Sequence, residues 1–173
     1  MDLRYPRPAA LSYSYKIAAV WHDGTPIDPR GALVLPGQYT VSLKVGGKEY
    51  TQPLSVKLDP RVHVQPEALR QQLELAQTIS ALLNKVVATY HAADQMLKTK
   101  KKNGAPEADI HSLTTLTTKG KPSLASVAGV LANLVNVVQM ADAAPTQGQR
   151  AAFAHYKKQF NGLLQQWEKM KSI

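Results

Sequence analysis

The spacing of hydrophobic and polar residues changes once along the chain, near residue 62. Before that point the clearest pattern has the period of two that is typical of a β-strand. Its apolar positions, separated by polar ones, are Tyr39, Val41, Leu43 and Val45. Gly46 and Gly47 follow, and two glycines supply the positive φ angles of a two-residue hairpin turn. The pattern predicts an antiparallel hairpin at 38–58, in which Val45 pairs with Lys48 and Tyr39 pairs with Leu54.

The residues around this hairpin predict a small β unit over 1–62. Residues 12–20 form a β-prone run, whereas 22–37 collect glycines and prolines and indicate a loop. Pro53 lacks an amide hydrogen and is expected at a strand edge or a bulge. Four tyrosines fall on the expected strands, where cross-strand packing is favoured over a stacking surface for carbohydrate or single-stranded nucleic acid. They are Tyr13, Tyr15, Tyr39 and Tyr50.

After Pro66 the apolar positions recur with the period of a helix. The pattern predicts one helix of roughly 30 residues that ends at Asn103 and Gly104, a second from near Ser123 to near Asp142, and a third after residue 146. Thr146 and Gln149 fit a capping box for the third helix. Residues 105–121 fit either a short helix over 107–116 or a loop. We therefore predict an antiparallel three-helix bundle over 63–173, with the second helix at its centre.

The second predicted helix has no charged residue between 122 and 141, which is long enough for a membrane span. Its small and polar residues, however, recur at steps of three and four along one face. They are Ser126, Gly129, Asn133 and Asn136. A helix packed within a protein explains this stripe better than one facing lipid. No membrane span is predicted.

The formal net charge of +9 is concentrated around one segment. Residues 98–121 hold six lysines and two acidic residues, and four of these lysines are Lys98, Lys100, Lys101 and Lys102. Lysines in the last turn of a helix complement the helix dipole, which is their more common role. The alternative is a lysine-rich loop that binds nucleic acid or another anionic partner.

Catalytic chemistry has little support in the residues. The chain has no cysteine, which excludes disulfides and thiolate zinc ligands. Its five histidines are scattered, and the nucleophile-elbow, phosphate-loop and His-Glu-x-x-His zinc motifs do not occur. His91 and Asp94 are spaced to share a helical face, but two potential ligands are too few for a metal site. We predict no catalytic residue, no metal and no cofactor.

Two stretches of the chain resemble a known family. The run from Gly31 to Val62, which ends in Asp-Pro-Arg-Val, is similar to the carboxy-terminal region of bacterial sialidase-repeat (BNR), sortilin-like β-propeller proteins. Residues 141–149 and the Trp-bearing final helix resemble the same region, as do residues 2–6. These propeller proteins are commonly described as glycosyl-hydrolase-like.

The resemblance implies a non-catalytic accessory module of a larger exported protein. The propeller that would hold any catalytic surface is not in this chain, and the module would be a partial immunoglobulin-like sandwich followed by helices. Its partner would be the propeller domain of the same parent chain or another protein, outside the cytoplasm. A sandwich without its first strands would also have an unpaired strand edge, through which two copies could associate. The alternative function is a small basic protein that binds an anionic partner through the lysine-rich segment.

Overall fold

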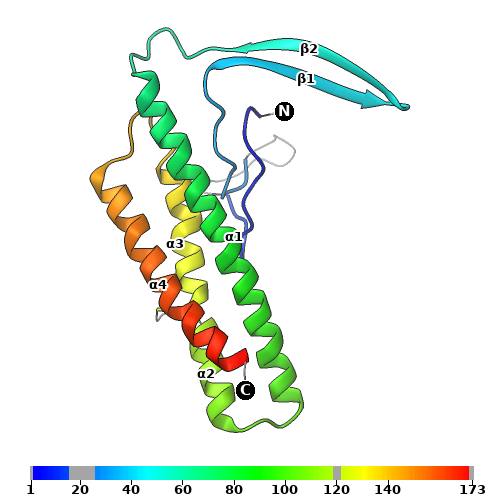
Figure 1. Ribbon diagram of the computed structural model, residues 1–173, viewed down its shortest axis with the longest axis vertical. Helices are drawn as coiled ribbons and strands as arrows, with labels where there is room; N and C mark the ends of the chain where they lie inside the picture. Colours follow the sequence, from blue (N-terminus) through cyan, green and yellow to red (C-terminus); the bar gives the residue numbers. More distant parts are fainter. Residues whose placement is uncertain (1, 16–25, 119–121, 172–173) are drawn as a thin grey trace.

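The computed structural model describes residues 2–15, 26–118 and 122–171. The prediction of a mixed α+β fold is confirmed: a two-stranded antiparallel sheet precedes four helices (Figure 1). The elements are β1 (Gly37–Val45), β2 (Lys48–Val56), α1 (Pro66–Lys102), α2 (Glu107–Thr117), α3 (Leu124–Val137) and α4 (Gln147–Lys171).

The predicted hairpin forms with the predicted register. Val45 pairs with Lys48, and Tyr39 pairs with Leu54. Gly46 and Gly47 adopt φ angles of +56° and +76°, which a residue with a Cβ atom adopts only with strain. The two strands extend away from one end of the helices as a long ribbon (Figure 1).

The Asp-Pro-Arg motif forms the turn between the ribbon and α1. The Asp59 carboxylate accepts hydrogen bonds from the Arg61 backbone N–H, at 2.9 Å, and from the Arg61 guanidinium. These bonds favour the charged carboxylate and lower the pKa of Asp59. Pro66 then occupies the start of α1, where its missing N–H costs nothing.

Among the described residues the helical part contains four helices rather than three, so the predicted three-helix bundle is not confirmed. Residues 107–117, which the sequence left open, form α2. Leu113 and Leu116 are buried in the core, and this burial outweighs the weak helix preference of the threonines. The Thr114 and Thr117 hydroxyls donate to carbonyls one turn back within α2, which satisfies them without breaking the helix.

α3 packs against each of the other three helices, as α1 also does, so these contacts do not single out α3 as the centre of the bundle. Ser123 caps it: its hydroxyl accepts from the Ser126 N–H at 3.2 Å, and its own N–H donates to the Ser126 hydroxyl. α3 ends at Val137, earlier than predicted. The predicted apolar face is buried and consists of Leu124, Val127, Leu131, Leu134 and Val138. The capping box of α4 is also confirmed, because Thr146 and Gln149 exchange two hydrogen bonds.

The described residues before β1 run along the helices. Ala32 is buried in the helical core, and the Ala9 N–H donates to the Asn84 side chain at 2.7 Å. Within the described part of the chain, β1 and β2 form the sheet, and the other strand-like pairs are two isolated bridges. The partial immunoglobulin-like sandwich is therefore not confirmed. Most of the strand predicted over 12–20 lies outside the described residues.

None of the described helices combines the length and the hydrophobicity needed to cross a membrane. This agrees with the prediction for residues 122–141. The lack of charge in that segment is explained by the packing of α3, because most of its residues are buried in the protein.

Candidate interaction surface

The ribbon has one apolar face. Residues opposite each other in an antiparallel register point to the same side, so the apolar residues of this face are Tyr39, Val41, Leu43, Val45, Tyr50, Leu54 and Val56. Two polar residues lie on the same side: Lys48, opposite Val45, and Gln52, opposite Val41. Towards the turn it is open to solvent, since Leu43 is 59% exposed and Val45 and Tyr50 are each 57% exposed. Contiguous exposed apolar residues of this kind mark binding surfaces in soluble proteins. We call these seven residues the ribbon face.

The opposite side of the ribbon is polar. Ser42 donates a hydrogen bond to the Glu49 carboxylate, and Lys44 lies 3.7 Å from the same residue. The Gln38 amide donates to the Ser55 hydroxyl at 3.2 Å. The ribbon is therefore amphipathic, as a strand pair is when a core covers one of its sides. A two-stranded hairpin alone is only marginally stable in water, so a covering layer would stabilise it.

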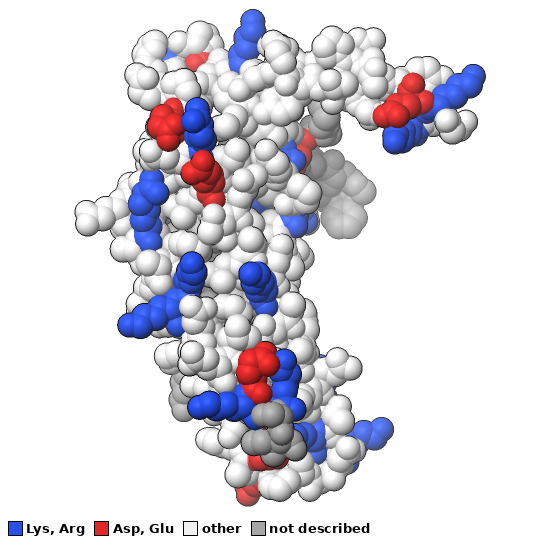
Figure 2. Space-filling model, in the orientation of Figure 1, with Lys and Arg blue, Asp and Glu red and all other residues white. Residues whose placement is uncertain are grey.

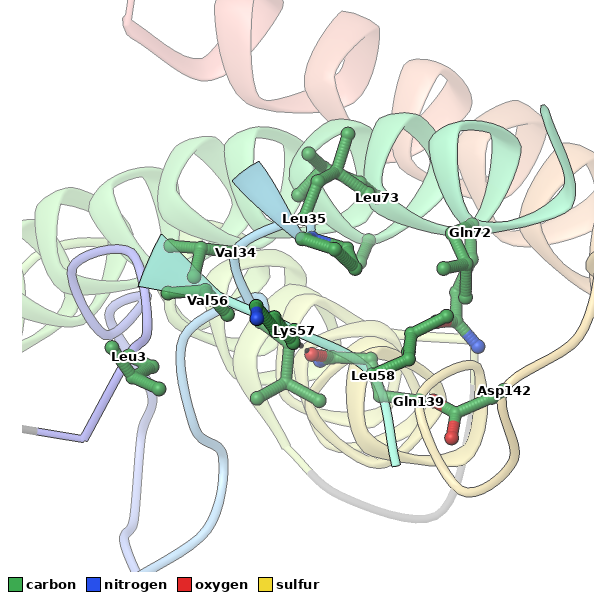
Figure 3. Close-up of a pocket in the computed structure, with 14 residues that line it drawn as sticks. Leu3, Val34, Leu35, Val56, Lys57, Leu58, Gln72, Leu73, Gln139 and Asp142 are labelled. Carbon is green, nitrogen blue, oxygen red and sulfur yellow. Dashed lines mark hydrogen bonds between the residues drawn. The ribbon is translucent and has the colours of Figure 1, made fainter. Parts of the chain in front are cut away.

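A small cavity lies where the ribbon meets the helices (Figure 3). Its volume is about 150 Å³, well below the ~300–1,000 Å³ typical of ligand pockets. Its apolar lining includes Leu35, Val56, Leu58, Leu69 and Leu73. A space of this size and chemistry suits one or two apolar side chains of a partner rather than a cofactor.

The two glutamines that border the cavity already serve the fold. Gln72 donates to the Val138 carbonyl at 2.8 Å and to the Ala141 carbonyl. Gln139 accepts from the Leu33 N–H at 2.8 Å and donates to the Val135 carbonyl at 2.7 Å. Lys57 and Asp142 also border the cavity, and both are exposed. The cavity therefore offers an apolar lining with charges of both signs nearby, and its amides are committed to other groups.

Sequence reasoning missed this use of amides. It assigned Asn136 to a polar stripe, but Asn136 is only 7% exposed and accepts a hydrogen bond from the Arg30 N–H at 3.2 Å. Together with Gln139, which lies in the turn after α3, it fixes the segment before β1 against this end of α3. The available signal was the spacing of two amides, three residues apart, at the end of a predicted helix without charges.

The four lysines singled out by the sequence lie in the last turns of α1, not in a loop. Lys98 pairs with Asp94 and Lys100 pairs with Asp109, each at 2.7 Å. The hydrogen bond that the Lys98 ammonium donates to the Asp94 carboxylate raises the pKa of Lys98. Lys101 and Lys102 are exposed and form no ion pair with another described residue. The structure thus neutralises two of the four charges locally.

Basic residues elsewhere do not gather into one patch on the visible face. Figure 2 shows Lys and Arg scattered along the molecule, several of them beside an acidic residue. Lys101 borders a groove of about 530 Å³, which also includes Tyr90, Asp94 and small residues of α3. Within the described ranges, no three His, Asp or Glu residues are placed to hold a metal ion.

The four tyrosines do not form one stacking surface. Tyr39 lies opposite Leu54, and its hydroxyl donates to the Leu35 carbonyl at 2.7 Å. The Tyr13 hydroxyl donates to the Pro8 carbonyl, and the Arg7 guanidinium lies 5.2 Å from its ring centre. Tyr13 and Tyr15 lie outside the two strands. The geometry favours packing roles for Tyr39 and Tyr13.

Comparison with protein-family models, with curated proteins and with solved structures gives no match. The resemblance to the BNR, sortilin-like proteins therefore stays a prediction. The ribbon face and the cavity at its base are the features on which a functional proposal can rest.

Proposed function

We propose that this chain is a non-catalytic interaction module that binds another protein region through the ribbon face. The observation that carries the proposal is the exposure of Leu43, Val45 and Tyr50 on a ribbon whose other side is polar. An apolar strand face is normally covered by a second layer. Binding would supply that layer.

The exposed part of the ribbon face is large enough to matter energetically. Burying a large apolar side chain completely contributes about 1.5–3 kcal/mol. Leu43, Val45 and Tyr50 are already partly covered, so covering the rest contributes roughly 3–5 kcal/mol in total before the costs of association. An apolar side chain of the partner placed in the cavity beside Leu35 and Leu73 would add to this.

The family resemblance suggests which partner this is. We propose that the chain is a module of a larger exported β-propeller protein, and that further strands of an immunoglobulin-like sandwich cover the ribbon face. The partner is then the propeller domain of the same parent chain or another protein. The similarity of residues 31–62 and 141–149 to that family supports this assignment.

The size of the native protein tests the proposal. An antibody raised against this chain is used on an immunoblot of the source cells and of their culture medium. A band several times larger than 18.9 kDa supports a module of a larger protein. A band at 18.9 kDa overturns that assignment. Hydrolysis of a glycoside panel by the purified chain, above a heat-inactivated control, would contradict a non-catalytic role.

A second function has one observation in its favour. Lys101 and Lys102 are exposed without an ion pair among the described residues, so they are available to an anionic partner such as nucleic acid. The ion pairs of Lys98 and Lys100 make this the weaker proposal. Phosphate binding releases counterions, so the affinity for a DNA or RNA oligonucleotide should fall steeply with salt and in a Lys101→Ala, Lys102→Ala variant. Salt-independent binding contradicts this function.

A further inference from the structure

The two edges of the ribbon differ in their capacity to accept another strand. A hairpin closed by a two-residue turn begins with a hydrogen-bonded pair, here Val45 and Lys48, and bonded pairs then alternate with non-bonded ones. Thr40 and Pro53 therefore form a non-bonded pair, in which backbone N–H groups point away from the partner strand. Pro53 loses no bond within the hairpin, but it removes a donor from the outer edge of β2.

The outer edge of β1 keeps all of its hydrogen-bonding groups. By the same alternation, the residues that present N–H and C=O groups outward are Gln38, Thr40, Ser42 and Lys44. None of these is a proline, and among the described residues no strand other than β2 pairs with β1. A long strand edge of this kind is a template for pairing with another chain.

We propose that a second copy of this chain occupies the β1 edge, with the two β1 strands antiparallel and a two-fold axis at Val41. The proposal rests on the proposed function, because it treats the ribbon as a binding element and assigns its edge a partner. In this register Val41 faces Val41 of the second copy, and Tyr39 faces Leu43. Gln38 faces Lys44, and Thr40 faces Ser42. The ladder then uses every outward backbone group from Gln38 to Lys44.

The side chains of β1 complement themselves in this register. On the apolar side, an aromatic ring meets a leucine at each end of the ladder, a favourable cross-strand pair. On the polar side, each Lys44 meets a neutral glutamine and keeps its own Glu49 beside it. The two copies of Lys44 are separated by six residues, or about 20 Å of strand. At physiological salt this exceeds the screening length of about 8 Å, so their repulsion is weak.

Edge pairing also addresses the weakness of an isolated hairpin. The two ribbons would form one four-stranded sheet, which meets the minimum of about three strands for independent stability. The outer edges of this sheet would be the two β2 strands, and Pro53 blocks both. The assembly therefore stops at two copies. The combined ribbon faces stay open to the layer assigned above, so the edge and the face take different partners.

Cysteine cross-linking tests the register. The chain has no cysteine, so a single introduced thiol gives one product. Across the axis, Val41→Cys would place two Cα atoms at the ~4.5 Å typical of a non-bonded antiparallel pair, within the range that a disulfide accepts. Gln52→Cys is the matched control, since Gln52 is opposite Val41 on the blocked strand. Under mild oxidation we expect Val41→Cys to form a covalent dimer at least about tenfold faster than Gln52→Cys. Equal rates overturn the proposal.

Paired proline substitutions test the edge without a cross-link. Ser42 and Thr51 are directly opposite, and both N–H groups point outward, so a proline at either position perturbs the hairpin alike. Sedimentation equilibrium measures the dissociation constant of the dimer. Ser42→Pro should raise this constant at least about tenfold, because each copy loses an edge hydrogen bond. Thr51→Pro should leave it unchanged. Ser42→Ala controls for the lost bond to Glu49 and should still dimerise.

The outcomes separate this inference from the proposed function. A wild-type chain that remains monomeric at high concentration, or equal effects of the two prolines, overturns the edge pairing. A large native band on the immunoblot would then still support the interaction module. Selective cross-linking at residue 41 together with a native band of 18.9 kDa supports the edge pairing and overturns the larger parent protein.

Discussion

The segment before β1 depends on the Gln139 side chain, and replacing Gln139 by methionine tests this. The substitution keeps the length and apolar part of the side chain but removes both polar groups. The Leu33 N–H loses its 2.8 Å acceptor, the Arg4 guanidinium loses one at 3.3 Å, and the Val135 carbonyl loses a side-chain donor. Arg4 keeps a 2.7 Å bond to the Gly31 carbonyl. The main cost is therefore the unsatisfied Leu33 N–H.

The expected loss of stability follows from that N–H. Leaving a buried donor unpaired costs about 1–3 kcal/mol, and here the site is only partly buried, so we expect about 1.5 kcal/mol. For a chain of this size that corresponds to a fall in Tm of roughly 3–6 °C. Thermal and urea unfolding followed by circular dichroism measure both quantities.

Two further variants isolate the cause. Gln139→Glu keeps an acceptor for Leu33 and Arg4, so it should recover most of the loss at neutral pH. Asn133→Ala changes an exposed amide on α3, the helix that precedes Gln139, and should stay within about 0.5 kcal/mol of the wild type. If Gln139→Met is as stable as Asn133→Ala, the hydrogen bonds of Gln139 do not hold the segment before β1 in place.

Three other substitutions have defined outcomes. Ser123→Ala removes the buried cap of α3 and should lower the free energy of unfolding by about 1 kcal/mol, measured in urea; no change would mean that the cap is dispensable. Arg61→Ala should raise the pKa of Asp59 towards its ordinary value in an NMR titration, because the guanidinium no longer stabilises the carboxylate. The lowered pKa stabilises the wild-type fold above the ordinary carboxyl pKa, and this contribution disappears as the pH falls through the folded-state pKa. If the pKa of Asp59 is the same in Arg61→Ala as in the wild type, the pairing is contradicted. Pro53→Thr should reopen the β2 edge, so that light scattering detects species larger than a dimer; an unchanged mass shows that Pro53 does not block it.

The hairpin could be predicted in register because all of its signals are local. Alternating side chains define the strands, and two adjacent glycines define the turn and hence the pairs. The caps at Ser123 and Thr146 likewise act within one helical turn. α2 could not be decided in this way, because its threonines disfavour a helix and only the burial of Leu113 and Leu116 by other helices decides the outcome.

The features of the candidate site could not be predicted from neighbouring residues, because they depend on contacts between segments far apart in the sequence. Lys100 is paired with Asp109 only because α2 forms and turns back beside the end of α1. Asn136 and Gln139 accept hydrogen bonds from the backbone because an extended segment about 100 residues earlier lies against this end of α3. The alternation of β1 indicated an apolar face, but not that the helices leave Leu43 and Tyr50 exposed.

Amide hydrogen exchange of the ribbon tests the central proposal most directly. Exchange is compared between this chain alone, at a concentration where it is monomeric, and the native protein purified from its source cells. If the ribbon face is a binding surface, the amides of 38–55 exchange quickly in the isolated chain and at least about tenfold more slowly in the native protein, because a covered ribbon opens less often. The α3 amides provide the internal reference and should change little. Equal exchange of the ribbon in both samples would contradict the proposal that a partner covers it.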